Sequence, residues 1–302
     1  MQYIFHLGVH QTATPYVQDT LTHNLEALRA QGVFYVNAEM PKAVLRHRRV
    51  VYRLSHPEKP TPEIEALVDT NHSVADAARA AGAKKVLFSN DYGLGPAMHE
   101  ALAMGLDDPA FYPRAHTCFR HIVRGFPLRK SRILVYSRNP ETYLTSLYSE
   151  AIRLGLTNLD IDGFCCSVAF DSVDFDGLRE RLSSLHSDLR ITIRAYERIR
   201  LGAETYMRTL LRDLGVQAHS FVFSPAPPED TLDAAQIEAL RHIAMGSETK
   251  RPALVKQLRE QVTSHLPNPS NRLALPDWVR DRLRAREQNE IAHFVTMAAN
   301  SL

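Results

Sequence analysis

Cysteine is scarce in this chain, and the few cysteines lack the spacing of known cysteine sites. There are three, Cys118 and the adjacent pair Cys165 and Cys166. No C-x-x-C pair occurs, so the sequence indicates neither a zinc site nor a dithiol redox motif. So few cysteines are typical of proteins from a reducing compartment.

Long apolar runs and a strong excess of one charge are also missing. No apolar run approaches the ~18 residues that a membrane helix needs. The apolar residues 3–5 begin the chain without the basic segment and the long apolar segment of a signal peptide. Lys and Arg number 36 against 34 Asp and Glu, a net charge of +2. Nucleic-acid binding usually requires a larger basic excess. We therefore expect a cytoplasmic protein with no membrane span and no nucleic-acid partner.

The pattern that is present is that of an α/β protein. The chain has 302 residues, 44% of them hydrophobic and 23% charged, which is ordinary globular composition. Residues 3–7 form an apolar run that predicts a strand, and a polar loop and a helical pattern follow it up to Gly32. A second apolar run, residues 33–36, completes a strand–helix–strand unit, which favours a parallel sheet.

Further apolar runs at 85–89, 132–137, 190–194 and 221–223 predict four more strands. Helical patterns lie at 42–53, 64–81, 116–126 and 141–154, and the chain after the Pro-rich turn at 225–228 is mostly helical. We expect one domain, 1–302, of the α/β class. It should have a central parallel sheet flanked by helices in residues 1–224 and a helical C-terminal part in 225–302.

The loop after the first strand, GVHQTATP at residues 8–15, has the position of an anion site. The N-terminus of a helix presents unpaired N–H groups and a positive partial charge. Thr12 and Thr14 add hydroxyl donors, and Pro15 suits a first helical turn. The Walker pattern fails, because Ala13 and Thr14 stand where Gly and Lys are required. The loop alone is equally compatible with a strand–helix turn that has threonine caps.

A second segment, RILVYSRNPETYLTSLY at 132–148, places Arg138 at the carboxyl end of a strand and Ser146 on the following helix. Ligands of open parallel sheets bind outside the carboxyl ends of the strands, where the first loop also lies. An Arg at a strand end is often only solvated. Asn-Pro directly after it and a Ser eight positions later make a more specific combination.

These segments resemble the sulfotransferases that use 3′-phosphoadenosine 5′-phosphosulfate (PAPS), especially their bacterial branch. HLGVHQTATPYVQ is similar to the family's 5′-phosphosulfate loop, and SRNPETYLTSLY is similar to its 3′-phosphate motif. ITIRAYERI resembles the strand that ends in Tyr-Glu near the adenine, and VLFSNDYGLG resembles a strand that ends in an acidic residue. The resemblance spans roughly residues 3–215 and implies a P-loop-like sulfotransferase fold.

The resemblance also implies a donor and a set of binding residues. The donor is PAPS, the product is adenosine 3′,5′-bisphosphate, and no metal takes part. By this resemblance the 5′-phosphosulfate contacts Thr12, Ala13 and Thr14, the 3′-phosphate contacts Arg138 and Ser146, and the adenine faces Tyr196. A planar guanidinium suits bidentate contact with phosphate. For Tyr196, a half-buried aromatic at a strand end is an equally open interpretation.

The chain departs from the family at the loop lysine, which is Gln11 here. An amide still donates a hydrogen bond, but a charge-assisted bond is roughly twice as strong. The replacement therefore lowers the rate of transfer by ~10–100-fold if the contact tightens in the transition state. We expect a sulfotransferase acting on a hydroxyl of a carbohydrate or small metabolite; the alternative is a weak or inactive homologue that binds nucleotide or a sulfated ligand. An ATP-using P-loop-like kinase is a less favoured third alternative.

Two residues are candidates for catalysis. His10 precedes Gln11 and supplies part of the missing positive charge, or else it only packs or caps. Asp91, at the end of the third strand, accepts the proton of the acceptor hydroxyl, or else it forms an Asx turn. A basic stretch nearby either lines the entrance for an anionic ligand or is a solvated helix face; its residues are Lys42, Arg46, Arg48, Arg49 and Arg53.

Overall fold

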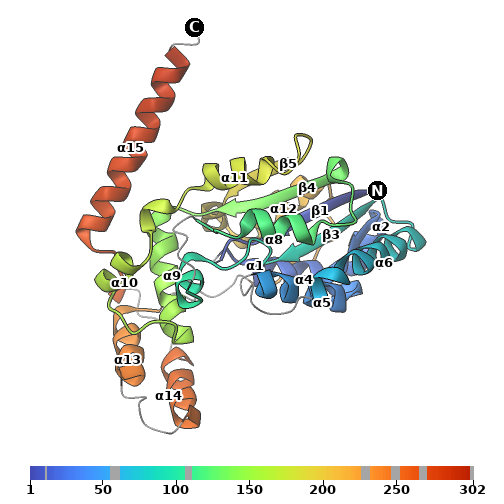
Figure 1. The fold of residues 1–302 in the computed structure, drawn as a ribbon. Helices are drawn as coiled ribbons and strands as arrows, with labels where there is room; N and C mark the ends of the chain where they lie inside the picture. Colours follow the sequence, from blue (N-terminus) through green and yellow to red (C-terminus); the bar gives the residue numbers. More distant parts are fainter. Residues whose placement is uncertain are drawn as a thin grey trace. The chain divides into compact units, whose positions relative to one another are not determined.

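The computed structural model describes residues 1–10, 12–54, 62–105, 111–225, 232–245, 252–264 and 271–299. The chain divides into two compact units (Figure 1), one of residues 1–139 with 174–228 and the other of residues 140–173 with 229–302. Residues 140–173, which the sequence pattern assigned to the α/β core, therefore cluster with the C-terminal helices. Gln11, the predicted replacement of the loop lysine, lies outside the described residues.

The first unit contains a parallel sheet of five strands in the order β2-β3-β1-β4-β5. The strands are β1 (Gln2–Leu7), β2 (Val33–Tyr35), β3 (Lys85–Asn90), β4 (Ser131–Ser137) and β5 (Arg190–Ala195). Every neighbouring pair is parallel. The predicted α/β class with a central parallel sheet is thus confirmed, and β1 is its central strand.

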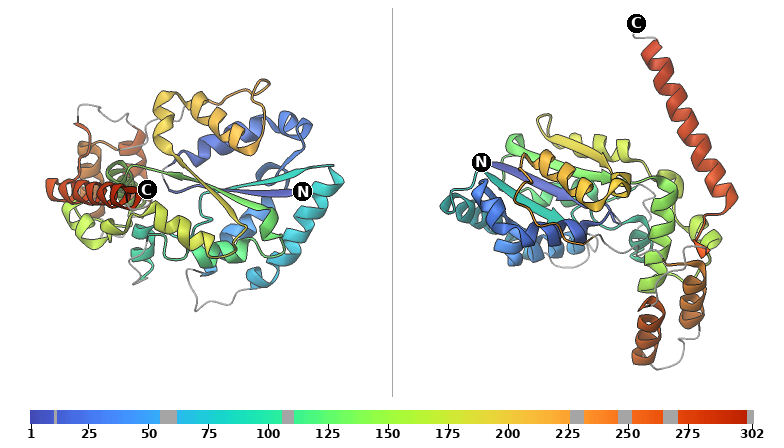
Figure 2. Two further views of the ribbon diagram at one scale, coloured as in Figure 1. Left: turned by 90° about the horizontal axis from the view of Figure 1, so that it is seen from above. Right: turned by 180° about the vertical axis from the view of Figure 1, so that it is seen from behind.

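Helices cover both faces of this sheet (Figure 2). Because side chains alternate along a strand, Ile4 of β1 packs into one core and Phe5 into the other. The Ile4 core includes side chains of α1 (Thr14–His23), α2 (Leu25–Ala30) and α12 (Ala203–Leu214). On the other face, Phe5 stacks on Phe88 at 5.0 Å and meets Phe119 of α8 (Ala115–Ile122) edge-on at 5.4 Å.

The remaining helices of the first unit lie between these elements along the chain. They are α3 (Val36–Glu39), α4 (Pro41–Leu54), α5 (Pro62–Glu65), α6 (Leu67–Ala80), α7 (Met98–Ala103) and α11 (Phe175–Ser183), with 3₁₀ turns at Leu128–Lys130 and Tyr196–Leu201. The ring of His47 on α4 stacks on Phe88 at 5.0 Å, so α4 packs on the same face of the sheet as α8.

The predicted strand at 221–223 is wrong, and the side chain of Asn24 explains why. Asn24 Nδ2 donates to the carbonyl of Val222 at 2.7 Å, and Asn24 Oδ1 accepts from the N–H of Val222 at 2.7 Å. The backbone groups that a strand would pair are therefore satisfied by one amide. Asn24 also separates α1 from α2, where the apolar pattern predicted a single helix.

The second unit is helical. It contains α9 (Pro140–Leu154), α10 (Ile161–Ser167), α13 (Ala234–Met245), α14 (Pro252–Ser264) and α15 (Asp277–Ala299), with a 3₁₀ turn at Phe170–Ser172. Trp278 of α15 packs edge-on against Phe170 at 5.5 Å and donates from Nε1 to Asp162 Oδ1 at 2.9 Å. Within the described part of the chain, no helix is long and apolar enough to cross a membrane.

Candidate functional site

The carboxyl end of the sheet contains a point where the chain changes direction. After β1 the chain runs to β2 and β3 on one side, and after β4 it runs to β5 on the other. At such a switch point the two following loops diverge and leave room for a ligand. The loop at 8–13 and the residues Arg138 and Asn139 follow these two neighbouring strands, so two of the predicted binding segments meet at one edge.

Two residues of the loop after β1, Gly8 and Ala13, restrict its backbone conformation. A Cβ on Gly8 would lie 1.9 Å from Oγ1 of Thr14, so only glycine allows this close approach. Ala13 is left-handed, with φ 54° and ψ 32°, and immediately precedes α1. Non-glycine residues in this region cost about 1–3 kcal/mol and cluster at functional sites. The loop is therefore held in a strained shape just before the helix.

The hydroxyls of the two predicted threonines have different environments. Thr12 Oγ1 donates to the carbonyl of Val9 at 2.6 Å, so this hydroxyl closes the loop and does not cap the helix. Thr14 Oγ1 is buried and has no hydrogen-bond partner among the described residues. Pro15 occupies the first turn of α1, as predicted, and the backbone N–H groups of Thr14 and Tyr16 are the first-turn donors there. Among the described residues of the loop, the donors for an anion are therefore chiefly backbone N–H groups.

Arg138 and Tyr196 come together beside this loop. The Arg138 guanidinium carbon lies 4.9 Å from the centre of the Tyr196 ring, in a cation–π arrangement. The N–H of Asn139 donates to Glu197 Oε1 at 2.6 Å, which joins the chain after β4 to the chain after β5. The structure thus brings together two residues that lie far apart in the sequence.

Tyr206 connects this pair to the loop, although no sequence motif indicates this role. Its ring meets that of Tyr196 edge-on at 5.9 Å, and its phenol donates to the carbonyl of Thr12 at 3.0 Å. Burial raises the pKa of Tyr206 well above its usual value, so the phenol keeps its proton and donates the hydrogen bond. Its partners lie on other elements, and only the folded chain brings them together.

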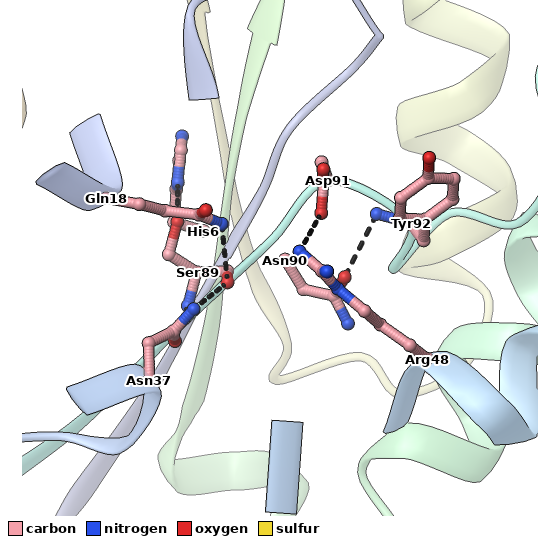
Figure 3. A network of polar contacts seen from close by, with 8 residues as sticks. All are labelled: His6, Gln18, Asn37, Arg48, Ser89, Asn90, Asp91 and Tyr92. Carbon is pink, nitrogen blue, oxygen red and sulfur yellow. Dashed lines mark hydrogen bonds and ion pairs between the residues drawn. The ribbon is translucent and has the colours of Figure 1, made fainter. Parts of the chain in front are cut away.

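Asp91, directly after β3, forms an ion pair with Arg48. Arg48 of α4 donates from Nη2 to Asp91 Oδ1 at 2.9 Å (Figure 3), and its guanidinium lies over the Tyr92 ring at 5.6 Å. The Asx turn in this loop is made by Asn90, whose Oδ1 accepts from the N–H of Tyr92 at 3.0 Å. The Asp91 carboxylate is about a quarter exposed, at 28%. It therefore pairs with a cation and remains accessible to solvent.

His10 is held by Tyr112 and Glu100, residues that no sequence motif indicates. Its backbone N–H donates to the Tyr112 phenol at 2.9 Å, and its ring Nδ1 is 2.8 Å from the same oxygen. Its Nε2 lies 3.2 Å from Glu100 Oε2. Burial raises the pKa of Glu100, but His10, His99 and the N–H of Ala97 outweigh burial and lower it to about 2. Both ring nitrogens of His10 thus face protein groups.

A polar network links the sheet to the helices just below this edge. His6 of β1 shares a hydrogen bond of 2.9 Å with Ser89 Oγ, and Asn37 bonds both backbone groups of Ser89 at 2.6 and 3.0 Å (Figure 3). Gln18 of α1 donates to the Ser89 carbonyl at 3.1 Å. Asn37 therefore continues the β2–β3 pairing beyond the end of β2, and the network fixes α1 against the strands.

Ser146 lies on α9, in the second unit, and is buried. Its predicted contact with the 3′-phosphate stays a prediction. In the described part of the chain, no three His, Cys, Asp or Glu side chains gather as a metal site requires.

Comparison with known proteins gives one structural likeness. No protein-family model and no curated protein matches the chain. A solved crystal structure of a sulfotransferase from Alicyclobacillus acidocaldarius is similar over 89% of this chain and 98% of that chain, with 14% identity and a TM-score of 0.43. A likeness of this degree carries no inference about activity.

Proposed function

We propose that the protein is a PAPS-dependent sulfotransferase that acts on a hydroxyl of a carbohydrate or small metabolite. The observation that carries the proposal is the contact of Arg138 with Tyr196 at the switch point, joined through Tyr206 to the loop after β1. A nucleotide with phosphates at both ends of its ribose requires an anion site at each end. The loop and Arg138 are two such sites on neighbouring strands.

Each part of the donor has a proposed partner. The 5′-phosphosulfate binds the loop and the first-turn N–H groups of α1, where the helix dipole favours an anion. Arg138 binds the 3′-phosphate with two parallel N–H donors, and Tyr196 supplies an aromatic face for the adenine. Ser146 is a further proposed ligand of the 3′-phosphate on sequence grounds alone.

In the proposed reaction the acceptor oxygen attacks the sulfur and the bond from sulfur to the bisphosphate breaks. The bisphosphate leaves with the electron pair, and the acceptor proton passes to Asp91, which Arg48 orients. Positioning and charge stabilisation supply most of the rate, by analogy with phosphoryl transfer.

A specific observation favours a second candidate, a homologue that binds the nucleotide without turning it over. Gln11 stands where the family has its lysine, so the loop has no fixed positive charge from that position. Binding by backbone N–H groups survives this change, whereas stabilisation of the departing bisphosphate does not.

The variant Gln11→Lys separates the two candidates. Release of adenosine 3′,5′-bisphosphate from PAPS is measured with a panel of carbohydrate and alcohol acceptors, alongside nucleotide affinity by calorimetry. For an enzyme, the lysine raises both affinity and transfer, the latter by ~10-fold or more. Tighter binding with no transfer supports the binding protein. Unchanged affinity means that residue 11 does not face the phosphosulfate and contradicts the loop assignment.

A further inference from the structure

Helix α4 carries a stripe of basic residues on its outward side. Lys42, Arg46, Arg49 and Arg53 are spaced by four, three and four residues. At about 100° per residue they fall within roughly 60° of the helix circumference. The opposite side is buried and packs into the first unit, through Ala43, Val44, His47, Val50 and Val51. The stripe therefore lies along the surface of the helix and runs for about 16 Å.

Little of this positive charge is neutralised. Arg53 lies 3.9 Å from Glu63, at the long end of an ion pair. Among the described residues no ion pair involves Lys42, Arg46 or Arg49. A protein with a net charge of only +2 thus concentrates four cations on one face of one helix, and three of them have no ion pair in the described part of the chain, which points to an anionic partner.

Two exposed apolar side chains lie between the stripe and the candidate site. Leu45 and Tyr52 are 51% and 47% exposed. By helix geometry they occupy the flank next to the stripe, and Arg48 follows them around the helix. Arg48 in turn contacts Asp91 and Tyr92 (Figure 3). The order from the outer face inward is therefore cations, apolar surface, and the pair of Arg48 with Asp91.

We propose that the outward face of α4 binds the acceptor, and that this acceptor is an anionic carbohydrate chain with carboxylate or sulfate groups. The inference rests on the proposed sulfuryl transfer and names its substrate class. The stripe binds the charged groups, Leu45 and Tyr52 contact the apolar faces of the sugar rings, and a sugar hydroxyl reaches Asp91. An anionic carbohydrate chain presents carboxylate or sulfate groups together with hydroxyl groups that can accept a sulfuryl group.

Other polyanions fit this face less well. A helix that lies in a membrane surface buries a wide apolar face in lipid, whereas the apolar side of α4 is buried in the protein core. Nucleic-acid binding depends on many phosphate contacts, and the stripe supplies four cations in a nearly neutral protein.

The test compares two triple variants of the full chain with equal charge change. The stripe variant is Lys42→Glu, Arg46→Glu and Arg49→Glu. The control variant is Arg129→Glu, Arg190→Glu and Arg212→Glu, exposed residues before β4, at the start of β5 and on α12. Binding of fluorescent chondroitin sulfate, hyaluronan and neutral dextran is measured at two salt concentrations. Adenosine 3′,5′-bisphosphate binding and thermal unfolding are measured for each variant.

We expect the two anionic glycans to bind and dextran not to bind. The stripe variant should lose at least about tenfold in affinity with a shallower salt dependence, while the control variant changes little. Equal losses in both variants, or no binding of either anionic glycan, overturn the proposal. So does tighter binding of single-stranded DNA or phosphatidylserine vesicles through the same residues. Glycan binding through the stripe without any bisphosphate binding leaves the surface assignment in place and overturns the proposed transfer.

Discussion

The phenol of Tyr206 on α12 donates a hydrogen bond of 3.0 Å to the carbonyl of Thr12, the residue before the left-handed Ala13. Tyr206→Phe removes the donor and leaves a buried carbonyl without a partner. We expect the free energy of unfolding to fall by about 1–3 kcal/mol. Nucleotide affinity should also weaken, because the loop is no longer hydrogen-bonded to α12. Urea unfolding and calorimetry measure the two effects.

Tyr148→Phe is the matched control for this prediction. Tyr148 also donates from a buried ring to a backbone carbonyl, that of Leu159 at 2.9 Å, but in the second unit. It should lower stability to a similar degree and leave nucleotide affinity as it is. Equal effects of both variants on affinity would show that Tyr206 acts only through general stability.

Ala13 should tolerate glycine and reject a β-branched side chain. The left-handed conformation costs an alanine about 1–2 kcal/mol and costs glycine little. Glycine has more conformational freedom in the unfolded chain, and its greater loss of entropy on folding offsets about 0.5–1 kcal/mol of this gain. Ala13→Gly should therefore raise the unfolding free energy by up to about 1 kcal/mol, and Ala13→Val should lower it by more than about 1 kcal/mol. Ala27→Gly in α2 should lower the unfolding free energy. A stabilising effect of Ala27→Gly would show that the gain at position 13 does not come from its left-handed conformation.

Three buried histidines make the fold sensitive to mild acid. Burial lowers the pKa of His6, His47 and His99 to about 4, against about 6.5 in the unfolded chain. The unfolded state therefore binds protons first as the pH falls. The contribution of these histidines to the free energy of unfolding is fully present above about pH 6.5. It is lost as the pH falls toward 4, at up to about 1.4 kcal/mol per pH unit for each histidine.

His47→Gln tests this dependence, because glutamine also offers an N–H to the Asn71 oxygen that His47 Nε2 contacts at 2.9 Å. Unfolding free energies between pH 7 and 5 should decline less steeply in this variant. Over that range the folded Glu100 is ionised, because its pKa is about 2, and the unfolded carboxyl takes up protons only toward pH 5, so Glu100 adds little slope and adds it equally in both proteins. An unchanged slope in His47→Gln would show that His47 does not take up a proton on unfolding.

Asp91→Asn should reduce turnover of an accepted substrate by ~100-fold or more, since general-base catalysis contributes typically 10²–10⁴-fold. The amide oxygen still accepts from Arg48, so nucleotide binding should hardly change. Steady-state kinetics and calorimetry measure both. Unchanged turnover with intact binding would leave Asp91 as a partner of Arg48 only.

The sequence pattern predicted most of the sheet because each strand is a short apolar run closed by turn residues. It failed at 221–223, where the run is apolar but the backbone of Val222 pairs with the Asn24 side chain. It also predicted that Arg138 and the loop after β1 lie at one edge, since parallel strands align their carboxyl ends, whereas Tyr196 was predicted from the family resemblance alone. The contacts of Glu100 and Tyr112 with His10 could not be predicted, because they join the loop after β1 to α7 and to the segment before α8, and neither carries a motif.

Affinities for two nucleotides decide whether Arg138 binds a 3′-phosphate. Adenosine 3′,5′-bisphosphate and AMP differ only in that phosphate, so the bisphosphate should bind about 10–150-fold more tightly. Arg138→Ala should remove most of this difference, Arg138→Lys should retain part of it, and the distant Arg212→Ala should retain all of it. Equal affinity for the two nucleotides in the unaltered protein, or a preference that survives Arg138→Ala, would show that Arg138 does not bind a 3′-phosphate.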